Sequence, residues 1–411
     1  MRSLIAALAT STALLVGAPA SATDLEVTHW WTSGGEAAAV KVLADSFTAA
    51  GGTWKDSAIA GSGDTARPII ISRITGGNPM GATQLNTGRD AEDLIKAGLM
   101  TDLTELAEKE GWKDFIRPSK LLDACMYEGK VYCVPINIHS WQWMWTNPNV
   151  FKEAGVEPPK SWTEFVAAAP KLKEKGFIPL ATGDGWQVEG IRNVLTVALG
   201  GSDLFLKIAR DKDAEAAKGP EMRKVWEGME AARSFADPGF VGRQWNEATG
   251  LVLTGKAGAQ IMGDWAQGEF GLAGKVAGTD YDCLPGLGEK EILDTGGDAF
   301  YFPKNSDPAV TEAQLKLASL LVSKEVQVAF NLKKGSLPIR GDIDMAAANA
   351  CMQKGIAILA KEGAVLPSNE QLLSSDTQGQ IQDLAAEFFS APEMTVDEAL
   401  EKFSEIIASA K

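Results

Sequence analysis

The sequence predicts an α/β protein with two lobes. Short apolar segments typical of β-strands alternate with amphipathic helical segments along most of the chain, the pattern of helices layered on sheets. The chain has 411 residues, which is more than one hydrophobic core usually accommodates. Three extended segments, 134–138, 294–303 and 335–340, are candidates for places where the chain crosses between lobes. Three crossings would make both lobes discontinuous in sequence.

The first residues predict an export signal. Arg2 is followed by an apolar run from Leu4 to Val16 without further charge, and Ala20-Ser21-Ala22 offers the small-x-small pattern of a signal peptidase site. The run is too short for a membrane span. We therefore expect residues 1–22 to be a signal peptide that is cleaved after Ala22. A lipid anchor is not expected, because no Cys follows the cleavage point.

The remaining elements follow from hydrophobic periodicity and from capping residues. A first strand is expected at 25–30, and a helix at 36–50 that ends at a Gly pair. Ser161 and Glu164 have the spacing of a capping box, which would open a helix that ends before Gly176. Two further long helices are expected at 311–332 and 395–410.

The four cysteines of this chain predict two disulfides. Cys125 and Cys133 flank a segment with the pattern of strand, Glu-Gly-Lys turn and strand, so a bridge across that hairpin is easily formed. Cys283 and Cys351 would then pair by default, although four cysteines allow three connectivities. No C-x-x-C motif or Cys/His cluster occurs, so we expect no metal site.

The apparent catalytic and cofactor-binding motifs are incomplete or have a structural explanation. Residues 250–257 match a phosphate-binding loop until Ala257, where Ser or Thr should hold Mg²⁺, and 61–66 form a glycine-rich turn better explained as a strand-to-helix connection. The two histidines, His29 and His139, lie in no catalytic motif. We expect no cofactor and no enzyme activity. A secreted glycosidase remains the minor alternative, because carboxylates are numerous although no pair is singled out.

The charge and hydropathy of the chain limit the classes of molecule that it is expected to bind. The formal net charge is −15, which repels the phosphate backbone of nucleic acids and offers no anchor to anionic lipids. After the signal, no stretch approaches the roughly 18 apolar residues of a spanning helix. We expect no nucleic-acid binding and no direct membrane insertion.

Tryptophan is the unusual component, with 12 residues in the chain. Trp30 ends the first expected strand and Trp31 directly follows it, at the end where open α/β sheets bind ligands. Adjacent residues on a strand point in opposite directions, so they cannot both enter one core face. The other tryptophans that we expect mainly in the core are Trp54, Trp112, Trp141, Trp143, Trp145, Trp162 and Trp226.

Tryptophan suits sugar binding for a physical reason. One face of a pyranose presents C–H groups, which stack on the negative face of an indole. The ring edge carries hydroxyls that both donate and accept, so carboxylates, amides and ammonium groups bind them in fork-like sets. A hydroxyl buried without a partner costs about 1–3 kcal/mol, which is how such sites reject wrong epimers.

The chain resembles the sugar-binding proteins of ABC importers, specifically the glucose-type extracellular solute-binding proteins. The similarity runs through nearly the whole mature chain and rests on motifs in a fixed order. These motifs are His29-Trp30-Trp31, Pro135 to His139, Pro158 to Phe165, Gly255-Lys256-Ala257 leading to Met262-Gly263-Asp264-Trp265, and Lys334 to Arg340.

The resemblance implies a periplasmic-binding-protein fold of type II, in which two lobes close on the ligand about a three-segment hinge. The N-terminal lobe would comprise 23–136 and 297–340, and the C-terminal lobe 137–296 and 341–411. The protein would be a periplasmic monomer that delivers its sugar to membrane permease subunits. A monosaccharide such as glucose or a related aldose is the expected ligand.

The resemblance also implies the site residues. Trp30 and Trp31 match an aromatic pair that covers the sugar from one lobe, and Trp245 and Trp265 match the opposing aromatics. Polar groups for the hydroxyls would come from an amide, a carboxylate and an ammonium. The full set of ligand-binding residues expected on this basis is Trp30, Trp31, Glu36, Gln84, Asn86, Trp186, Trp245, Trp265, Asp298 and Lys334.

The sequence departs from the glucose-type pattern at two positions. Relatives that bind glucose often place His or Lys two residues after the amide, where this chain has Asn86. They also carry a His near 365–369, where Ser368 or Asn369 must fill the space. The shorter side chains leave room for an extra substituent, another epimer or a bridging water. A disaccharide, a polyol or another non-sugar solute therefore stay as alternatives.

Overall fold

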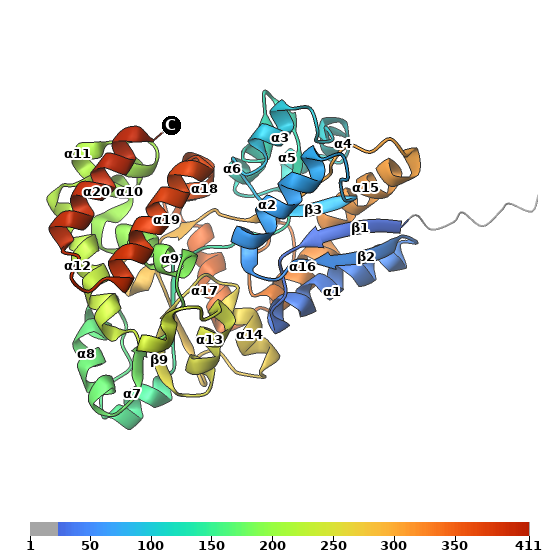
Figure 1. Cartoon of the computed structure of the whole chain (residues 1–411). Helices are drawn as coiled ribbons and strands as arrows, with labels where there is room; N and C mark the ends of the chain where they lie inside the picture. Colours follow the sequence, from blue (N-terminus) through green and yellow to red (C-terminus); the bar gives the residue numbers. More distant parts are fainter. Residues whose placement is uncertain (1–23, 411) are drawn as a thin grey trace, which may run out of the picture.

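Two separate β-sheets divide the protein into two lobes (Figure 1). The computed structural model describes residues 24–410, so the expected signal peptide at 1–22 lies outside the described residues. One sheet has the strand order β2-β1-β3-β12-β6, and the other has the order β10-β7-β9-β8. Each sheet is covered by helices, which gives the expected α/β architecture with one layered core in each lobe.

The N-terminal lobe is built on the five-stranded sheet. Strands β1, β2 and β3 are parallel, whereas β12 runs antiparallel between β3 and β6. Helices α1 and α15 pack against this sheet, and α16 packs against α1. In Figure 1 the orange α15 and α16 lie among the blue elements of the chain start. The strands are β1 (Asp24–His29), β2 (Thr53–Ala58), β3 (Ala82–Asn86), β6 (Cys133–Pro135) and β12 (Asp298–Tyr301), with the hairpin β4 (Met126–Tyr127) and β5 (Lys130–Val131). The helices are α1 (Gly34–Ala49), α2 (Ser62–Thr75), α3 (Glu92–Lys96), α4 (Thr104–Lys109), α5 (Trp112–Phe115), α6 (Ser119–Asp123), α15 (Pro308–Leu321) and α16 (Lys324–Lys334).

The C-terminal lobe surrounds the four-stranded sheet. Its last helices, α19 and α20, pack on α9, α11 and α12, so the red end of the chain lies beside its green middle in Figure 1. The strands are β7 (Trp143–Thr146), β8 (Ile178–Leu180), β9 (Ala257–Ile261) and β10 (Asp282–Pro285), with the pair β11 (Leu293–Asp294) and β13 (Val365–Leu366). The helices are α7 (Pro148–Ala154), α8 (Trp162–Glu174), α9 (Trp186–Leu195) with a π-helical continuation (Thr196–Gly200), α10 (Gly201–Ala209), α11 (Ala214–Ala217), α12 (Pro220–Phe235), α13 (Trp245–Leu253), α14 (Ala266–Leu272), α17 (Ala350–Leu359), α18 (Asn369–Leu372), α19 (Ser375–Ser390) and α20 (Val396–Ser409).

The three crossing segments are hydrogen-bonded to one another between the lobes. Ile138 donates its backbone N–H to Leu337 and accepts from the Leu337 N–H, at 2.7 and 2.9 Å. His139 donates its N–H to the Gly296 carbonyl at 3.0 Å. The expected three-segment hinge is therefore present as one bonded unit. Within it, we propose that the lobes exchange chain at 136/137, 296/297 and 340/341.

The lobes also touch away from the hinge. Gly35 at the start of α1 donates its N–H to the Glu269 carboxylate on α14 at 2.8 Å. A Cβ on Gly35 would come within 2.5 Å of the Gly268 carbonyl carbon, so the close approach of the two helices requires glycine. On α19, Gln382 donates to the Asp64 carboxylate of α2 at 3.0 Å.

Most expected elements are confirmed, with two corrections. The strand at 25–30, the helix near 36–50 and the helix at 395–410 correspond to β1, α1 and α20. The expected helix at 311–332 is wrong as a single element, because Val322 ends α15 and the Ser323 hydroxyl caps α16. The helical pattern continues across the break because both helices turn an apolar face to the same core.

The capping box expected at Ser161 is only half formed. The Ser161 hydroxyl accepts from the Glu164 N–H, as expected for an N-cap. The Glu164 carboxylate, however, accepts from the Lys160 N–H one residue earlier than the capping-box pattern. The helix therefore starts where it was expected. The prediction of a capping box was wrong only for the bond from the Ser161 N–H to the Glu164 carboxylate.

Both expected disulfides are present. Cys125 and Cys133 join the ends of the β4–β5 hairpin, and Cys283 on β10 is bonded to Cys351 on α17. The second bridge closes 68 residues, so its loop-closure contribution is larger, about 4 kcal/mol against about 2–3 kcal/mol for the hairpin bridge. Among the described helices, none is long and apolar enough to cross a membrane.

Candidate sugar-binding cavity

A cavity of about 800 Å³ lies between the lobes, and it is lined by every expected site residue except Gln84. Its volume falls in the upper part of the range that is usual for small-molecule sites. Both lobes contribute to the wall, so a ligand could contact both at once. The expected residues on the wall are Trp30, Trp31, Glu36, Asn86, Trp186, Trp245, Trp265, Asp298 and Lys334.

The N-terminal aromatic pair lies at the carboxyl end of β1. Trp31 is 2% exposed and packs its ring against Phe300 and Phe330, with centroid distances of 5.8 and 5.6 Å. Trp30 points the other way and is partly exposed, with the Arg67 guanidinium 5.1 Å from its ring centroid. The two rings therefore have different surroundings. Trp31 lies between the cavity wall and the hydrophobic core, whereas Trp30 lies in the cavity wall and is partly exposed.

Asp298 is one of the carboxylates on the cavity wall. It starts β12, where antiparallel register places it opposite Asn86 on β3. Gln84 donates to its Oδ1 at 2.7 Å, and Asn137 donates to its Oδ2 at 2.8 Å. Gln84 lies behind the carboxylate, because its other amide atom accepts the Trp30 N–H at 3.0 Å. A carboxylate has room for about four hydrogen bonds, so Asp298 keeps acceptor capacity for a ligand.

His139 lies within ion-pair distance of the buried Asp298 carboxylate, and sequence reasoning did not place it in the site. Its Nδ1 lies 3.3 Å from Asp298 Oδ2. Burial alone would lower the pKa of His139, but the negative charge of Asp298 outweighs it and raises that pKa above its ordinary value. Burial alone would likewise raise the pKa of Asp298, yet the positive charge of His139 lowers it well below its usual range. The signal available in the sequence was position, since His139 directly follows the crossing segment 134–138.

Lys334 and Glu36 form a second buried ion pair. The Lys334 ammonium lies 3.1 Å from Glu36 Oε1, and its side chain is 2% exposed. The same carboxylate accepts the Ser33 N–H through Oε2, so Glu36 both caps α1 and holds Lys334. The ammonium also lies 5.6 Å from the Trp31 ring and 6.0 Å from the Trp265 ring. Lys334 therefore connects aromatic groups of the two lobes.

The C-terminal lobe contributes a cluster of three tryptophans. The Trp265 ring lies 4.9 Å from Trp141 and 6.4 Å from Trp186, and Trp141 lies 5.5 Å from Trp186. Trp186 and Trp245 are the first residues of α9 and α13, and Trp265 precedes α14. The aromatic side chains of the wall thus come from the N-terminal ends of helices at the carboxyl side of the sheet.

The expected core role of the tryptophan stripe is confirmed for Trp143 and Trp145 and is wrong for Trp141. Trp143 and Trp145 are fully buried and stacked, whereas Trp141 is partly exposed and lines the cavity. The strand begins only at Trp143, so the period of two does not extend back to Trp141. Gly190 accommodates the Trp141 ring, because a Cβ there would come within 2.1 Å of it.

Two side chains occupy the positions where the sequence departs from the glucose-type pattern. Asn86 is 8% exposed, lines the cavity, and its side-chain amide bonds to no other residue of the described chain. Asn369 lines the cavity and donates to Asn193 at 3.1 Å. Ser368 is buried next to Gly296 of the hinge and is not part of the wall. Of Ser368 and Asn369, it is thus Asn369 that lines the cavity.

Two further buried carboxyls lie beside the hinge. Asp264 accepts the Ser140 N–H at 3.2 Å, and burial raises the pKa of Asp264 to about 8. Asp294 accepts the Ser140 hydroxyl and the Trp141 N–H, and burial raises the pKa of Asp294 to about 6. Both groups bind a proton in the folded protein that the unfolded chain releases near pH 4.

We expect the free energy of unfolding to fall as the pH rises from about 4 to about 8. Stability from these protons is complete below the unfolded pKa near 4 and is lost as the pH passes the folded values. Asp264→Asn should reduce the slope throughout pH 4 to 8, whereas the control Asp294→Asn should reduce it only between pH 4 and 6. Urea unfolding at each pH measures this. Equal profiles in all three proteins would contradict the assignment.

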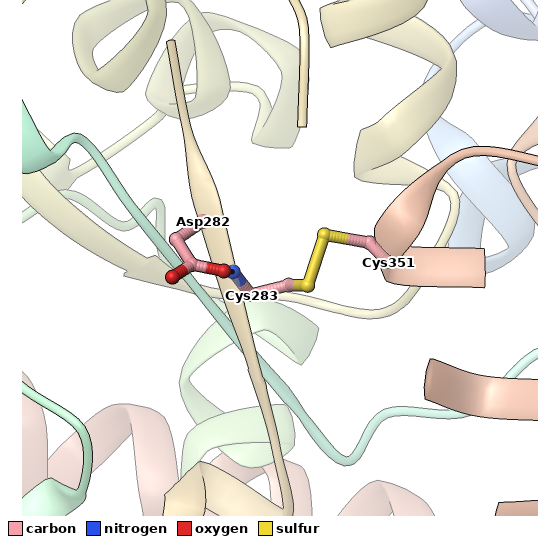
Figure 2. A group of neighbouring side chains, drawn as sticks. All are labelled: Asp282, Cys283 and Cys351. Carbon is pink, nitrogen blue, oxygen red and sulfur yellow. Dashed lines mark hydrogen bonds between the residues drawn. A yellow bond between two sulfur atoms is a disulfide. The ribbon is translucent and has the colours of Figure 1, made fainter. Parts of the chain in front are cut away.

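The one described group with metal-like spacing is a disulfide. Oxygen and sulfur atoms of Asp282, Cys283 and Cys351 lie within 4.8 Å of one another. The two sulfurs are bonded to each other, as Figure 2 shows, so neither is available as a thiolate. The Asp282 carboxylate is paired with Lys354 at 3.0 Å.

Comparisons with known proteins agree with this architecture. A probable sugar-binding periplasmic protein of Rhizobium meliloti (strain 1021) is 40% identical over 353 residues, covering 85% of this chain and 84% of that protein. A probable sugar-binding periplasmic protein of Mesorhizobium japonicum is 37% identical over 418 positions, covering 98% of each. The solved structure of a chitin oligosaccharide binding protein superposes with a TM-score of 0.77 at 20% identity, over 95% of this chain and 99% of that one, which is a likeness of fold.

The family follows from these matches together with the two lobes and the hinge. The model of the bacterial extracellular solute-binding protein family matches residues 31–328, which is most of the chain and includes parts of both lobes. The chain belongs to the bacterial extracellular solute-binding proteins, the ligand-capturing components of ABC importers.

Proposed function

We propose that the protein captures a sugar in the periplasm and delivers it to the permease of an ABC importer. The relatives named as probable sugar-binding periplasmic proteins support this proposal over most of the chain. The signal peptide would direct export and would be removed by cleavage after Ala22. The delivered form is the closed monomer, and its partners are the permease subunits in the membrane.

The observation that carries the proposal is the chemistry of the cavity wall. Trp265 and Trp30 offer aromatic faces from opposite lobes, and Asp298 keeps acceptor capacity between them. Aromatic faces stack on the C–H side of a pyranose, and the carboxylate accepts from its hydroxyls. Because binding can favour closure only through contacts that differ between the open and closed states, groups from both lobes are required.

We propose an aldopyranose unit, that of glucose or a related aldose, as the ligand of this wall. The simplest ligand that contains such a unit is a free monosaccharide. A disaccharide, a polyol or another small solute is the alternative. The short amide of Asn86 leaves space beside the ring for another epimer or a bridging water. A micromolar dissociation constant, about −8 kcal/mol, would suit capture followed by release.

A glycosidase is disfavoured by the state of the site carboxylates. A general acid must hold a proton near neutral pH, which requires a raised pKa. The pKa of Asp298 is shifted the other way: burial would raise it, but His139 lowers it. Glu36 is bound on both oxygens, by Lys334 and by the Ser33 N–H. Both groups are thus arranged to accept hydrogen bonds and to stay in place.

A thermal-shift screen of the mature protein tests the proposal. The panel contains neutral aldoses and their disaccharides, polyols, amino acids and sugar acids. A ligand at about 100 times its dissociation constant stabilises the fold by about 2.7 kcal/mol, which raises the melting temperature visibly. We expect a shift with neutral sugars and none with sugar acids, because Lys334 and Arg67 are already paired with carboxylates. A shift with amino acids or polyols alone would overturn the proposal.

A further inference from the structure

We infer that Glu269 is a positioning residue that sets the affinity for the captured sugar from outside the cavity. Its carboxylate holds the start of α1 against α14 in the closed form, and it does so without touching the ligand. The inference rests on the proposed function, because closure affects affinity only if a ligand is captured between the lobes. It is carried by the contacts that one face of α14 makes with the N-terminal lobe.

One face of α14 lies against the start of α1. The residues on this face have the spacing i, i+3, i+4 and i+7 and are Trp265, Gly268, Glu269 and Leu272. Trp265, at the N-terminal end of the face, is part of the cavity wall. One turn further along, Glu269 Oε1 accepts the Gly35 N–H at 2.8 Å. The ring that we propose for the ligand and the carboxylate that contacts α1 therefore belong to one helix and move together.

The two lobes approach each other at this contact through their backbones. A Cβ on Gly35 would lie 2.5 Å from the Gly268 carbonyl carbon, and a Cβ on Gly34 would lie 2.5 Å from a Leu272 methyl carbon. Gly268 also lies against the end of α16, where its Cβ would come within 3.1 Å of the Lys334 carbonyl oxygen. Glycine permits so close an approach, and an added methyl group at Gly35 would hold the lobes apart.

The Gly35–Glu269 bond is of a strong kind. Gly35 lies in the first turn of α1, a helix of 16 residues, and the first N–H groups of a helix lack partners within it. The Ser33 hydroxyl accepts the Glu36 N–H, and the Glu269 carboxylate of the other lobe accepts the Gly35 N–H. The helix dipole also favours a negative charge at this end. When the lobes separate, the N–H and the carboxylate both return to water, so the bond stabilises the closed form alone.

The segment that Glu269 holds is itself part of the cavity wall. The residues from Trp30 to Ser33 line the cavity, and so does Glu36, one residue after Gly35. Glu36 bonds in turn to the Lys334 ammonium at 3.1 Å. Glu269 does not line the cavity. It therefore acts on the ligand through the position of this segment and through the closure of the lobes.

Action through closure has a consequence that direct contact with the ligand lacks. The apparent dissociation constant rises as the population of the binding-competent closed form falls. This population is a property of the protein and does not depend on which sugar is offered. Loss of the Gly35–Glu269 bond should therefore weaken every captured sugar by the same factor. Loss of a wall residue changes the ratios between sugars instead, because each sugar contacts that residue differently.

Calorimetric titration of the mature protein with glucose, galactose, mannose and xylose tests the inference. We expect Glu269→Ala to weaken the binding of each sugar that the wild type binds by one common factor of about ten. Glu269→Gln should recover part of the loss, because its amide oxygen can still accept the Gly35 N–H. Gly35→Ala should weaken the same sugars at least about tenfold, because its methyl group would meet the Gly268 backbone.

Two matched variants control for general effects on the helices. Glu227 is exposed on α12 of the same lobe and does not line the cavity. Gly250 lies within α13, and a Cβ built on it has no atom within 4 Å. Glu227→Ala and Gly250→Ala should both leave every affinity within about twofold. The melting temperature of each variant without sugar verifies that it is folded.

The separation of the lobes gives a second readout, which needs no ligand. Ser72 on α2 and Asp383 on α19 are exposed and lie on helices that the Asp64–Gln382 bond connects across the lobes. Spin labels on Ser72→Cys and Asp383→Cys report the distance between these helices by double electron–electron resonance. We expect the wild type to populate a short-distance form that Glu269→Ala loses.

The outcomes separate the role of Glu269 from the proposed function. If Glu269→Ala leaves the affinities unchanged, or lowers them by factors that differ between sugars, the inference is wrong and the function stands. If no sugar binds the wild type, the proposed function fails, and the label distance then tests the Gly35–Glu269 bond alone. A distance distribution that is unchanged in Glu269→Ala would overturn the inference in that case, and loss of the short-distance form would support it.

Discussion

Replacing Trp265 by alanine weakens sugar binding at least about 100-fold, a loss of about 2.8 kcal/mol. The variant removes one of the aromatic faces that the C-terminal lobe presents to the cavity. It also removes the ring against which His139 lies at 5.0 Å and Trp141 at 4.9 Å, so both lose the contact that orients them. Calorimetric titration with the sugar identified in the screen measures the loss.

A matched tryptophan separates this effect from a general loss of aromatic packing. Trp54 on β2 is partly exposed and lies outside the cavity wall. Trp54→Ala should leave the affinity within about twofold, and Trp265→Phe should recover part of it, because a smaller ring still stacks. Circular dichroism verifies that each variant is folded. An unchanged affinity in Trp265→Ala would remove this residue from the site.

Asp298→Asn should also reduce affinity at least about 100-fold. The two carboxylate oxygens of Asp298 accept hydrogen bonds from the side-chain amides of Gln84 and Asn137. In Asp298→Asn one of these oxygens becomes an NH₂ group, which would face another N–H donor and could not accept its hydrogen bond. The charge that pairs with His139 would be lost at the same time. A ligand hydroxyl would then meet a displaced neutral group, and hydrogen bonds to charged groups are the stronger ones.

Asp264→Asn is the control for Asp298→Asn at pH 7. Burial raises the pKa of Asp264 to about 8, so the wild-type group is already neutral at this pH. Asp264 does not line the cavity, although it lies beside the same hinge. We expect its replacement to leave affinity within about threefold at pH 7. Similar losses in both variants would mean that hinge geometry, and not the Asp298 charge, controls binding.

Local patterns were sufficient to predict much of the fold. The Gly pair after α1 and the Glu-Gly turn between Cys125 and Cys133 were correctly placed because each depends on neighbours in sequence. The division into α15 and α16 was not predicted, because apolar periodicity continues through Ser323. The pairing of Cys283 with Cys351 was expected only by elimination, because it depends on the packing of α17 against β10, which no local pattern contains.

The placement of side chains around the cavity was predictable where residue type and strand end coincide. Trp30 and Trp31 follow β1, and Asp298 begins β12, so ordinary sheet geometry brings them to one edge. Gln84 could be placed next to this edge, but not behind Asp298, because the direction of a side chain depends on the neighbouring strand. His139 and Trp141 were missed because they lie between β6 and β7, where neither a helical nor a strand period applies.

A structure of the mature protein with its tightest sugar tests the central claim most directly. We expect the sugar in the cavity between the lobes, with one ring face on Trp265 and a hydroxyl within hydrogen-bond distance of Asp298. Contacts should come from both lobes at once. A sugar bound elsewhere, or held by one lobe alone, would contradict capture between the lobes.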